Sequence, residues 1–220
     1  MAGIPPTTRA DVAEAARIIT EAGLVEAFGH VSARTVDGFM ITATRPLGAA
    51  GENDVYEIVD GRPAEGATDV PLEVPMHAAV YAAREDVNAI CRTHSPAAVE
   101  AGARGEVPPL VHGLAGLAGE VAVCGRTDLV ADPEAGREIA EDLGSADCLL
   151  IRGNGSIATG LCLANAVVRA RYLEERCLVG RGLAPDDGWG TDRLKPRSRW
   201  FEKETSRAWA WLRWRYGRDS

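Results

Sequence analysis

The stretch that decides the fold runs from Leu72 to Ala98 and reads LEVPMHAAVYAAREDVNAICRTHSPAA. Its proline suits the first turn of a helix, so the first half predicts a helix from Pro75 through about Glu85. The second half predicts a strand from Ala89 to Thr93. Side chains two residues apart on a strand point to the same face, so we expect Arg92 and His94 to share a face.

Glu73, His77 and His94 surround this helix and strand, and their spacing carries a resemblance that covers most of residues 8–182. The segment is similar to the pattern E-x-x-x-H-x-x-x-Y-x-x-R-x-D-V-x-A-V-x-H-x-H-S-P of the class II aldolase and adducin family. That family holds aldolases, sugar-phosphate epimerases, decarboxylases and the adducin heads. Arg92 stands where the first histidine of the H-x-H pair is expected.

Two other blocks extend the resemblance. GHVSAR at residues 29–34 is similar to the family's early G-[NH]-[VI]-S-x-R loop, and residues 41–42 resemble the strand after it. LLIRGNG at residues 149–155, closed by Gly160, resembles the L-L-R-[NG]-H-G motif that usually delivers the third metal histidine. Asn154 takes the place of that histidine.

Strands and helices alternate along the chain, which predicts an α/β or layered α/β/α domain. The resemblance implies a three-layer α/β/α fold with a central, mainly antiparallel sheet, usually assembled as a homotetramer with sites between subunits. A length of 220 residues fits one domain. We assign residues 1–190 to the class II aldolase/adducin-like domain and residues 191–220 to a tryptophan-rich helical extension of the same domain.

Local patterns predict the remaining elements. Helices are expected from a cap at Thr7 or Thr8 to Gly23, after Ser95-Pro96, from Asp132 to Leu143 and from Leu163 to Gly180. Strands are expected at residues 31–34, 39–42, 55–59, 121–124 and 148–151. The glycine-rich segment from Thr44 to Asp54 predicts neither type, and residues 183–196 resemble a linker.

Composition indicates a soluble, cytoplasmic protein, with 46% hydrophobic and 25% charged residues. The stretch from Met1 to Ala16 lacks the apolar centre of a secretory signal, and no apolar run approaches the ~18–20 residues of a membrane span. The five cysteines are odd in number and lack C-x-x-C spacing, which favours buried thiols over disulfides or a zinc ribbon. We therefore expect no membrane partner.

Residues 191–220 are basic and aromatic, with nine Lys/Arg against four Asp/Glu in a chain of net charge −8. Such a mixture can bind nucleic acid, but an acidic body repels phosphate backbones. Ala208, Trp211 and Trp214 fall on one side of a predicted helix. We expect the helix from Trp200 to Trp214 to pack on its own or a neighbouring subunit, and we expect no nucleic-acid partner.

The resemblance implies a divalent metal held by three histidines, with the glutamate of the E-x-x-x-H segment as acid, base or further ligand. By position, Glu73 is that glutamate and His94 is the retained histidine. Arg92 cannot ligate a metal, because its guanidinium stays protonated and offers only donors. Asn154 completes a donor set that suits transition metals poorly. We expect no cofactor; Zn, Mn or Fe would bind only weakly, through His94 and Glu73.

Arg92 has two interpretations. In the first, its fixed cation stabilises a developing enolate and grips a substrate carboxylate bidentately. Asn154 would then donate to a substrate oxygen, and Glu73 or His94 would move a proton. In the second, Arg92 and Glu73 form an ion pair that fills the vacated metal site of a protein without lyase chemistry.

The four histidines fall at or near positions that the resemblance places around the active cleft. His30 follows the G-H-[VI]-S-x-R style of decarboxylase-like relatives, where many sugar-phosphate aldolases have asparagine. Candidate contacts to an anionic substrate are His30, Ser32, Arg34, Thr42 and His112. For the residues of the early loop and strand, the alternative is turn and strand hydrogen bonding.

These features predict a carbon–carbon lyase, closer to a decarboxylase than to an aldolase, that acts on a small carboxylated substrate in an altered or metal-free site. Two alternatives stay open. One is a non-catalytic binding or assembly protein like the adducin heads, and the other is an oxygenase-like relative that binds iron weakly. No role is assigned to His77, which could simply pack or cap its helix.

Overall fold

The computed structural model describes residues 7–67, 69–188 and 201–217. Its strands are β1 (His30–Arg34), β2 (Gly38–Thr42), β3 (Val55–Val59), β4 (Arg62–Pro63), β5 (Ala89–Thr93), β6 (Val121–Cys124), β7 (Cys148–Ile151) and β8 (Ser156–Gly160). They form one sheet in the order β4-β3-β2-β1-β5-β8-β7-β6. Every neighbouring pair is antiparallel except β6 and β7, so the expected mainly antiparallel sheet is confirmed.

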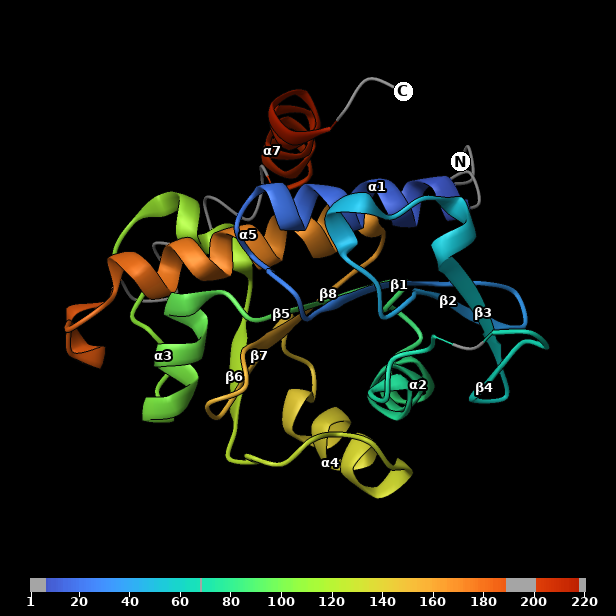
Figure 1. Cartoon of the computed structure of the whole chain (residues 1–220). Coiled ribbons are helices and arrows are strands. Elements are labelled where there is room, and N and C mark those ends of the chain that lie inside the picture. Colours follow the sequence, from blue (N-terminus) through green and yellow to red (C-terminus); the bar gives the residue numbers. More distant parts are fainter. Residues whose placement is uncertain (1–6, 68, 189–200, 218–220) are drawn as a thin grey trace.

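Helices cover both faces of this sheet. The α-helices are α1 (Arg9–Glu21), α2 (Val74–Ala83), α3 (Pro96–Arg104), α4 (Pro133–Leu143), α5 (Leu163–Val179) and α7 (Phe201–Tyr216). Short 3-10 helices are η1 (Leu47–Ala49), η2 (Glu52–Asp54), η3 (Gly113–Ala118) and η4 (Pro185–Asp187). Figure 1 shows α1 and α5 on one side of the sheet and α2 and α4 on the other, with α7 outside the first helical layer.

Local sequence explains where the helices start. Thr8 caps α1 in a reciprocal capping box with Asp11, as its sequence position predicts. Asp132 accepts two backbone N–H groups at the start of α4. Helix α2 has Pro75 in its first turn and Glu73 at the capping position, and it ends at Ala83, slightly before the expected Glu85. The predicted start and type of these helices are confirmed.

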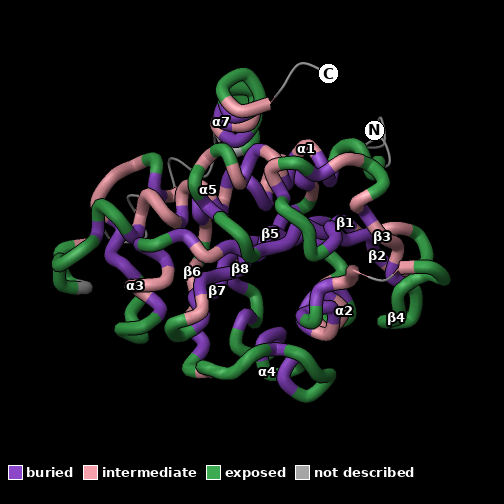
Figure 2. Tube along the Cα trace, in the orientation of Figure 1, coloured by how far each residue is buried: buried purple, intermediate pink, exposed green. Residues whose placement is uncertain are grey.

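The sheet separates two hydrophobic cores. One core joins α1, α3 and α5 to one face, and the other joins α2 and α4 to the opposite face. Because both faces are covered, the central strands β5, β7 and β8 are buried along their whole length (Figure 2). Polar side chains on these strands therefore need partners inside the protein.

The sequence interpretation missed strand β8, which pairs with both β5 and β7 at the centre of the sheet. The segment from Thr44 to Asp54, left undefined by its glycines, contains η1 and η2. The proposed linker lies partly outside the described residues. Trp189, Trp200 and the boundary proposed at residue 190 lie entirely outside the described residues.

Helix α7 packs on its own chain, against α5, α1 and η3. Ala208 and Leu212 are buried in this contact. Trp211 and Trp214 are 47% and 77% exposed, so they do not share the face by which Ala208 packs on this chain, and their packing on a neighbouring subunit stays a prediction. The buried stripe is formed by Thr205, Ala208 and Leu212, at spacings of three and four residues on the helix.

The five cysteines are free thiols, four of them buried and Cys162 half-buried, so the expectation of thiols without disulfides is confirmed. Within residues 7–67, 69–188 and 201–217, none of the helices has the length and apolar character needed to span a bilayer.

Candidate functional site

Four segments that are distant in sequence meet at one end of β5. The register of β1 and β5 places His30 opposite Arg92. Glu73 enters from the start of α2, and Asn154 from the turn between β7 and β8. Strand β5 ends at Thr93, so His94 lies just beyond it. The predicted catalytic residues Glu73, Arg92, His94 and Asn154 are therefore brought together by the fold.

Two motif glycines let these segments approach so closely. Gly155 has φ +75°, and a Cβ atom there would lie 2.1 Å from the Thr93 carbonyl oxygen and 3.0 Å from Nη1 of Arg92. Gly29 has φ +145°, and its Cβ would lie 2.8 Å from the Arg92 carbonyl oxygen. A side chain at either position would force the backbone off Arg92. The glycines of both motifs thus build the site by close packing.

Arg92 is fully buried and forms a two-point ion pair with Glu73. Its Nε donates to Oε2 of Glu73 at 3.1 Å, and its Nη2 donates to Oε1 at 3.3 Å. Nη2 also donates to Oδ1 of Asn154 at 3.1 Å, while Nη1 donates to the carbonyl oxygens of Thr93 at 2.9 Å and Ser156 at 3.5 Å. A guanidinium has five N–H groups, so every donor has an acceptor.

His94 and Asn154 are half-buried, whereas Glu73 and Arg92 are buried, so the histidine and the amide form the accessible edge of the cluster. Nδ1 of His94 lies 3.3 Å from the Phe28 carbonyl oxygen. Burial and the nearby Arg92 cation lower the pKa of His94, while Glu73 opposes the shift. The imidazole is therefore neutral near pH 7 and able to accept a proton.

His30 and His77 lie on the interior side of Glu73. His30 Nε2 is 3.8 Å from Oε2 of Glu73, and His30 Nδ1 is 3.4 Å from Nε2 of His77. Burial lowers the pKa of His77 to about 3, and Arg92 adds to the shift. Burial, His77 and Arg92 also hold the pKa of His30 well below its usual range. Both rings are neutral, and the connection through His77 is one that sequence reasoning missed.

Three predicted substrate contacts have hydrogen-bond partners within the protein. Ser32 bonds to His77 and Tyr81, and Thr42 accepts the backbone N–H of Val31. Arg34 donates to the carbonyl oxygens of residues 81, 84 and 87, at the end of α2 and just after it. These bonds match the alternative of strand and turn hydrogen bonding, and the substrate role stays a prediction.

His112 lies apart from the cluster. Its Nε2 is 3.7 Å from Oε1 of Glu175 on α5. Among the described residues, Nε2 of His112 has no hydrogen-bond partner, and Glu175 is the acidic group beside it. The structure therefore gathers three of the four histidines, His30, His77 and His94, and places the fourth beside α5.

The residues present do not fit the metal that the resemblance implies. Arg92 puts a cation with donors only at the centre of the cluster, and Oδ1 of Asn154 already accepts from it. In the described part of the chain, His, Cys, Asp and Glu side chains do not converge in groups of three that could hold a metal ion. Three such ligands are the usual minimum for a catalytic metal.

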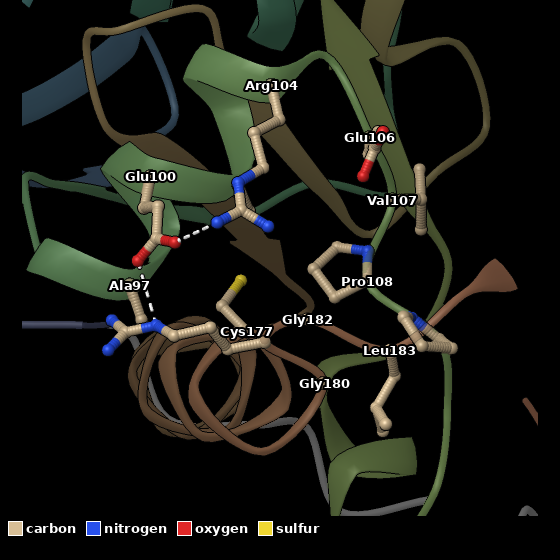
Figure 3. A pocket seen from close by; sticks show the side chains of 13 residues that line it. Ala97, Glu100, Arg104, Glu106, Val107, Pro108, Cys177, Gly180, Gly182 and Leu183 are labelled. Atoms are coloured by element: carbon tan, nitrogen blue, oxygen red, sulfur yellow. Dashed lines mark hydrogen bonds and ion pairs between the residues drawn. The ribbon is translucent and has the colours of Figure 1, made fainter. Parts of the chain in front are cut away.

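A separate pocket between α3, residues 106–109 and the end of α5 shares no residue with the cluster (Figure 3). Its charged groups already pair with one another, because Glu100 contacts Arg104 at 2.6 Å and Arg181 at 2.8 Å. Burial raises the pKa of the Cys177 thiol beside it to about 12, so this thiol stays protonated. This pocket does not compete with the Arg92 cluster as a reactive site.

Comparisons with known proteins agree with the fold. A sequence profile of the Class II Aldolase and Adducin N-terminal domain matches residues 10–179. The 3,4-dihydroxyphthalate decarboxylase of Rhodococcus jostii is 27% identical over 201 residues, covering 83% of this chain and 82% of that protein. A 5-methylthioribulose-1-phosphate/5-deoxyribulose-1-phosphate aldolase of Rhodospirillum rubrum is 29% identical, covering 81% and 85%.

Among solved structures, the L-fuculose 1-phosphate aldolase of Glaciozyma antarctica superposes with a TM-score of 0.75 at 18% identity. The match covers 98% of this chain and 97% of that chain. It therefore extends to both ends of the fold, including the region of α7.

Proposed function

Since the chain belongs to the class II aldolase and adducin family, we propose that it is a carbon–carbon lyase of the decarboxylase type that acts on a small carboxylated substrate. The observation that carries the proposal is a buried guanidinium, paired with Glu73, behind a half-buried imidazole and amide. The relatives named as dihydroxyphthalate decarboxylases support this reaction type. They also suggest a hydroxylated carboxylate as substrate.

His94 is the proposed general base. Its neutral imidazole takes the proton of a substrate hydroxyl, and the resulting oxyanion pushes electron density to the carbon that bears the carboxylate. The proton returns from His94 to that carbon. The bond to the carboxylate then breaks, CO2 leaves, and the electron pair of that bond restores the oxyanion, which takes a proton from solvent.

Arg92 stabilises the oxyanion through one exchange of partners. The acceptors on its N–H groups are the charged carboxylate of Glu73, two strand carbonyls and the neutral amide oxygen of Asn154. Asn154 is the only half-buried side chain among them, and a hydrogen bond to an anionic oxygen is stronger than one to an amide. A substrate oxyanion would therefore displace Oδ1 of Asn154 from Nη2, and the released amide can donate to the same substrate.

The test is CO2 release from a panel of hydroxylated aromatic and aliphatic carboxylates, 3,4-dihydroxyphthalate included, with the purified protein. His94→Gln should lower kcat by about 100-fold or more, as expected for loss of a general base. Arg92→Lys should be similarly impaired, because a lysine cannot reproduce the two-point pair. Arg104→Lys, in the separate pocket, is the matched control and should keep full activity. Full activity in His94→Gln would contradict the assigned role.

A second candidate is a binding or assembly protein without turnover. The observation that favours it is the complete set of acceptors around Arg92, which leaves no free donor for a ligand before an exchange occurs. The same carboxylate panel separates the two functions. Ligands that raise the melting temperature without being consumed support the binding protein; consumption of any of them supports the lyase.

Assembly as a cytoplasmic homotetramer is also part of the proposal, because the family resemblance implies sites between subunits. Helix α7 packs on its own chain and forms part of the surface of the subunit. Trp211 and Trp214 are exposed on this surface. Light scattering of the full chain tests the assembly, and a monomeric mass at micromolar concentration would contradict it.

A further inference from the structure

A continuous row of buried polar groups leads away from Glu73 into the protein. His30 Nε2 lies 3.8 Å from the Glu73 carboxylate, and His30 Nδ1 lies 3.4 Å from His77 Nε2. His77 Nδ1 lies 2.8 Å from Ser32 Oγ, which lies 2.8 Å from the Tyr81 hydroxyl oxygen. The row joins His30 and Ser32 on β1 to His77 and Tyr81, which lie four residues apart on α2. We call these five residues the Glu73 relay.

The carboxylate end of the relay sets the direction of its hydrogen bonds. Glu73 is an acceptor, so the stable arrangement turns an N–H of His30 toward it, and a bare Nε2 would be repelled. A neutral imidazole with its proton on Nε2 has a bare Nδ1, which accepts from Nε2 of His77. His77 then also has a bare Nδ1, which accepts the hydroxyl proton of Ser32.

The tyrosine end demands the same direction. The Ser32 hydroxyl donates its hydrogen bond to His77, and its oxygen accepts a hydrogen bond from the Tyr81 hydroxyl. In the reverse direction the Tyr81 hydroxyl would need another acceptor, and among the described residues Ser32 is the partner recorded for it. Burial raises the pKa of Tyr81, which keeps this group a donor. Both ends of the row therefore favour one arrangement of protons.

Neighbouring side chains hold the relay in place. The Phe39 ring stacks on His77 with centroids 6.2 Å apart and contacts Tyr81 at 5.1 Å. The Arg34 guanidinium lies 4.8 Å from the centre of the Tyr81 ring and is fixed by three carbonyl oxygens. Ser32 and His77 are fully buried and His30 is 9% exposed, so water does not compete for these groups.

We propose that the Glu73 relay is a one-directional hydrogen-bond chain from Tyr81 to His30 that faces the Glu73 carboxylate across 3.8 Å, that His30 and His77 both carry their proton on Nε2, and that the chain positions this carboxylate against Arg92. His30, His77, Ser32 and Tyr81 are positioning residues. The arrangement of protons follows from the geometry alone; only its effect on turnover rests on the proposed lyase function. Each donor along the chain polarises the next one, which increases the positive end of the His30 N–H dipole that faces Glu73 across 3.8 Å.

Nitrogen-15 NMR of histidine-labelled protein tests the arrangement directly. Protonated and bare imidazole nitrogens have well-separated shifts, and four histidines can be assigned from single His→Gln variants. Both His30 and His77 are expected as Nε2–H tautomers at pH 7. A proton on Nδ1 of either ring overturns the proposal, whether or not the protein is a lyase.

A pair of matched variants tests the positioning role. Ser32→Ala removes one buried hydroxyl from the relay. Thr159→Val removes one buried hydroxyl outside the relay and the Arg92 cluster, where Thr159 donates to the Asp147 carbonyl oxygen at 3.0 Å. Ser32→Ala should release the constraint on His77, with a second tautomer in the spectrum, and lower kcat about tenfold at unchanged KM. Thr159→Val should leave both tautomers and kcat unchanged. If the two folded variants show the same histidine tautomers in the spectra, the relay is overturned. If Ser32→Ala alters the tautomers but the unmodified protein shows no turnover, only the lyase function is overturned.

Discussion

Breaking the buried ion pair from one side should be far more costly than removing it whole. Arg92→Met keeps an unbranched side chain but removes five N–H donors, and it leaves the 5% exposed Glu73 carboxylate beside the neutral His30 ring at 3.8 Å. An unpaired buried charge costs about 3–5 kcal/mol. In addition, Asn154 and the carbonyl of Thr93 lose their donor.

The reciprocal variant, Glu73→Gln, leaves the Arg92 cation buried against a neutral amide and should fall in the same range of about 3–5 kcal/mol. The double variant Arg92→Met/Glu73→Leu carries no buried charge, so it should be within about 1–2 kcal/mol of the unmodified protein or more stable than it. Urea unfolding at pH 7, followed by circular dichroism, measures all of them. Arg92→Met costing less than about 1 kcal/mol, or a double variant as unstable as the sum of the single ones, would refute the reasoning.

Three further predictions follow from the packing and the charges. The pKa of His77 is lowered to about 3, so the unfolded chain binds a proton near pH 5 that the folded chain does not. The stabilisation from His77 is present above pH 6.5 and falls by about 2 kcal/mol between pH 7 and pH 5. The loss in urea curves should be smaller by this amount in His77→Gln, where His30 and His94, whose pKa values are also lowered, still contribute. Elemental analysis should find well below one transition metal per chain, and Arg92→His/Asn154→His should raise that content; a stoichiometric metal that survives dialysis of the unmodified protein would contradict the donor-set argument. Leu212→Ala should cost about 2–3 kcal/mol because it empties the contact under α7, whereas the exposed Trp214→Ala should stay within about 0.5 kcal/mol; equal midpoints would mean that α7 is not docked.

Much of the fold is accessible from the sequence, because its signals are local. The capping pair of Thr8 and Asp11 and the proline of α2 mark helix starts without reference to the rest of the chain. Strand β8 was missed for a physical reason. SIATG is short, polar in part and ends in glycine, so its strand conformation depends on pairing with β5 and β7 and much less on intrinsic preference.

The site is accessible only in part. The family motifs identify Glu73, Arg92, His94 and Asn154, which do meet in space. The relay through His77 is invisible in the sequence, since it depends on which turn of α2 faces β1 across the sheet. His112 shows the opposite failure: a histidine near a motif position finds a partner on α5 and stays away from the cluster.

Stability alone does not account for the buried arginine. Replacing a buried ion pair with apolar side chains of similar volume is often neutral or stabilising, so packing gives no reason to keep Arg92 and Glu73 in the interior. The accessible edge formed by His94 and Asn154 supplies one, because a cation held behind it can stabilise charge that develops on a bound molecule. The double variant Arg92→Met/Glu73→Leu then separates the two interpretations of the pair. If the double variant folds stably but no longer decarboxylates or binds carboxylates, the pair acts in catalysis or recognition. If it folds stably and binds ligands as before, the pair only occupies the vacated metal site.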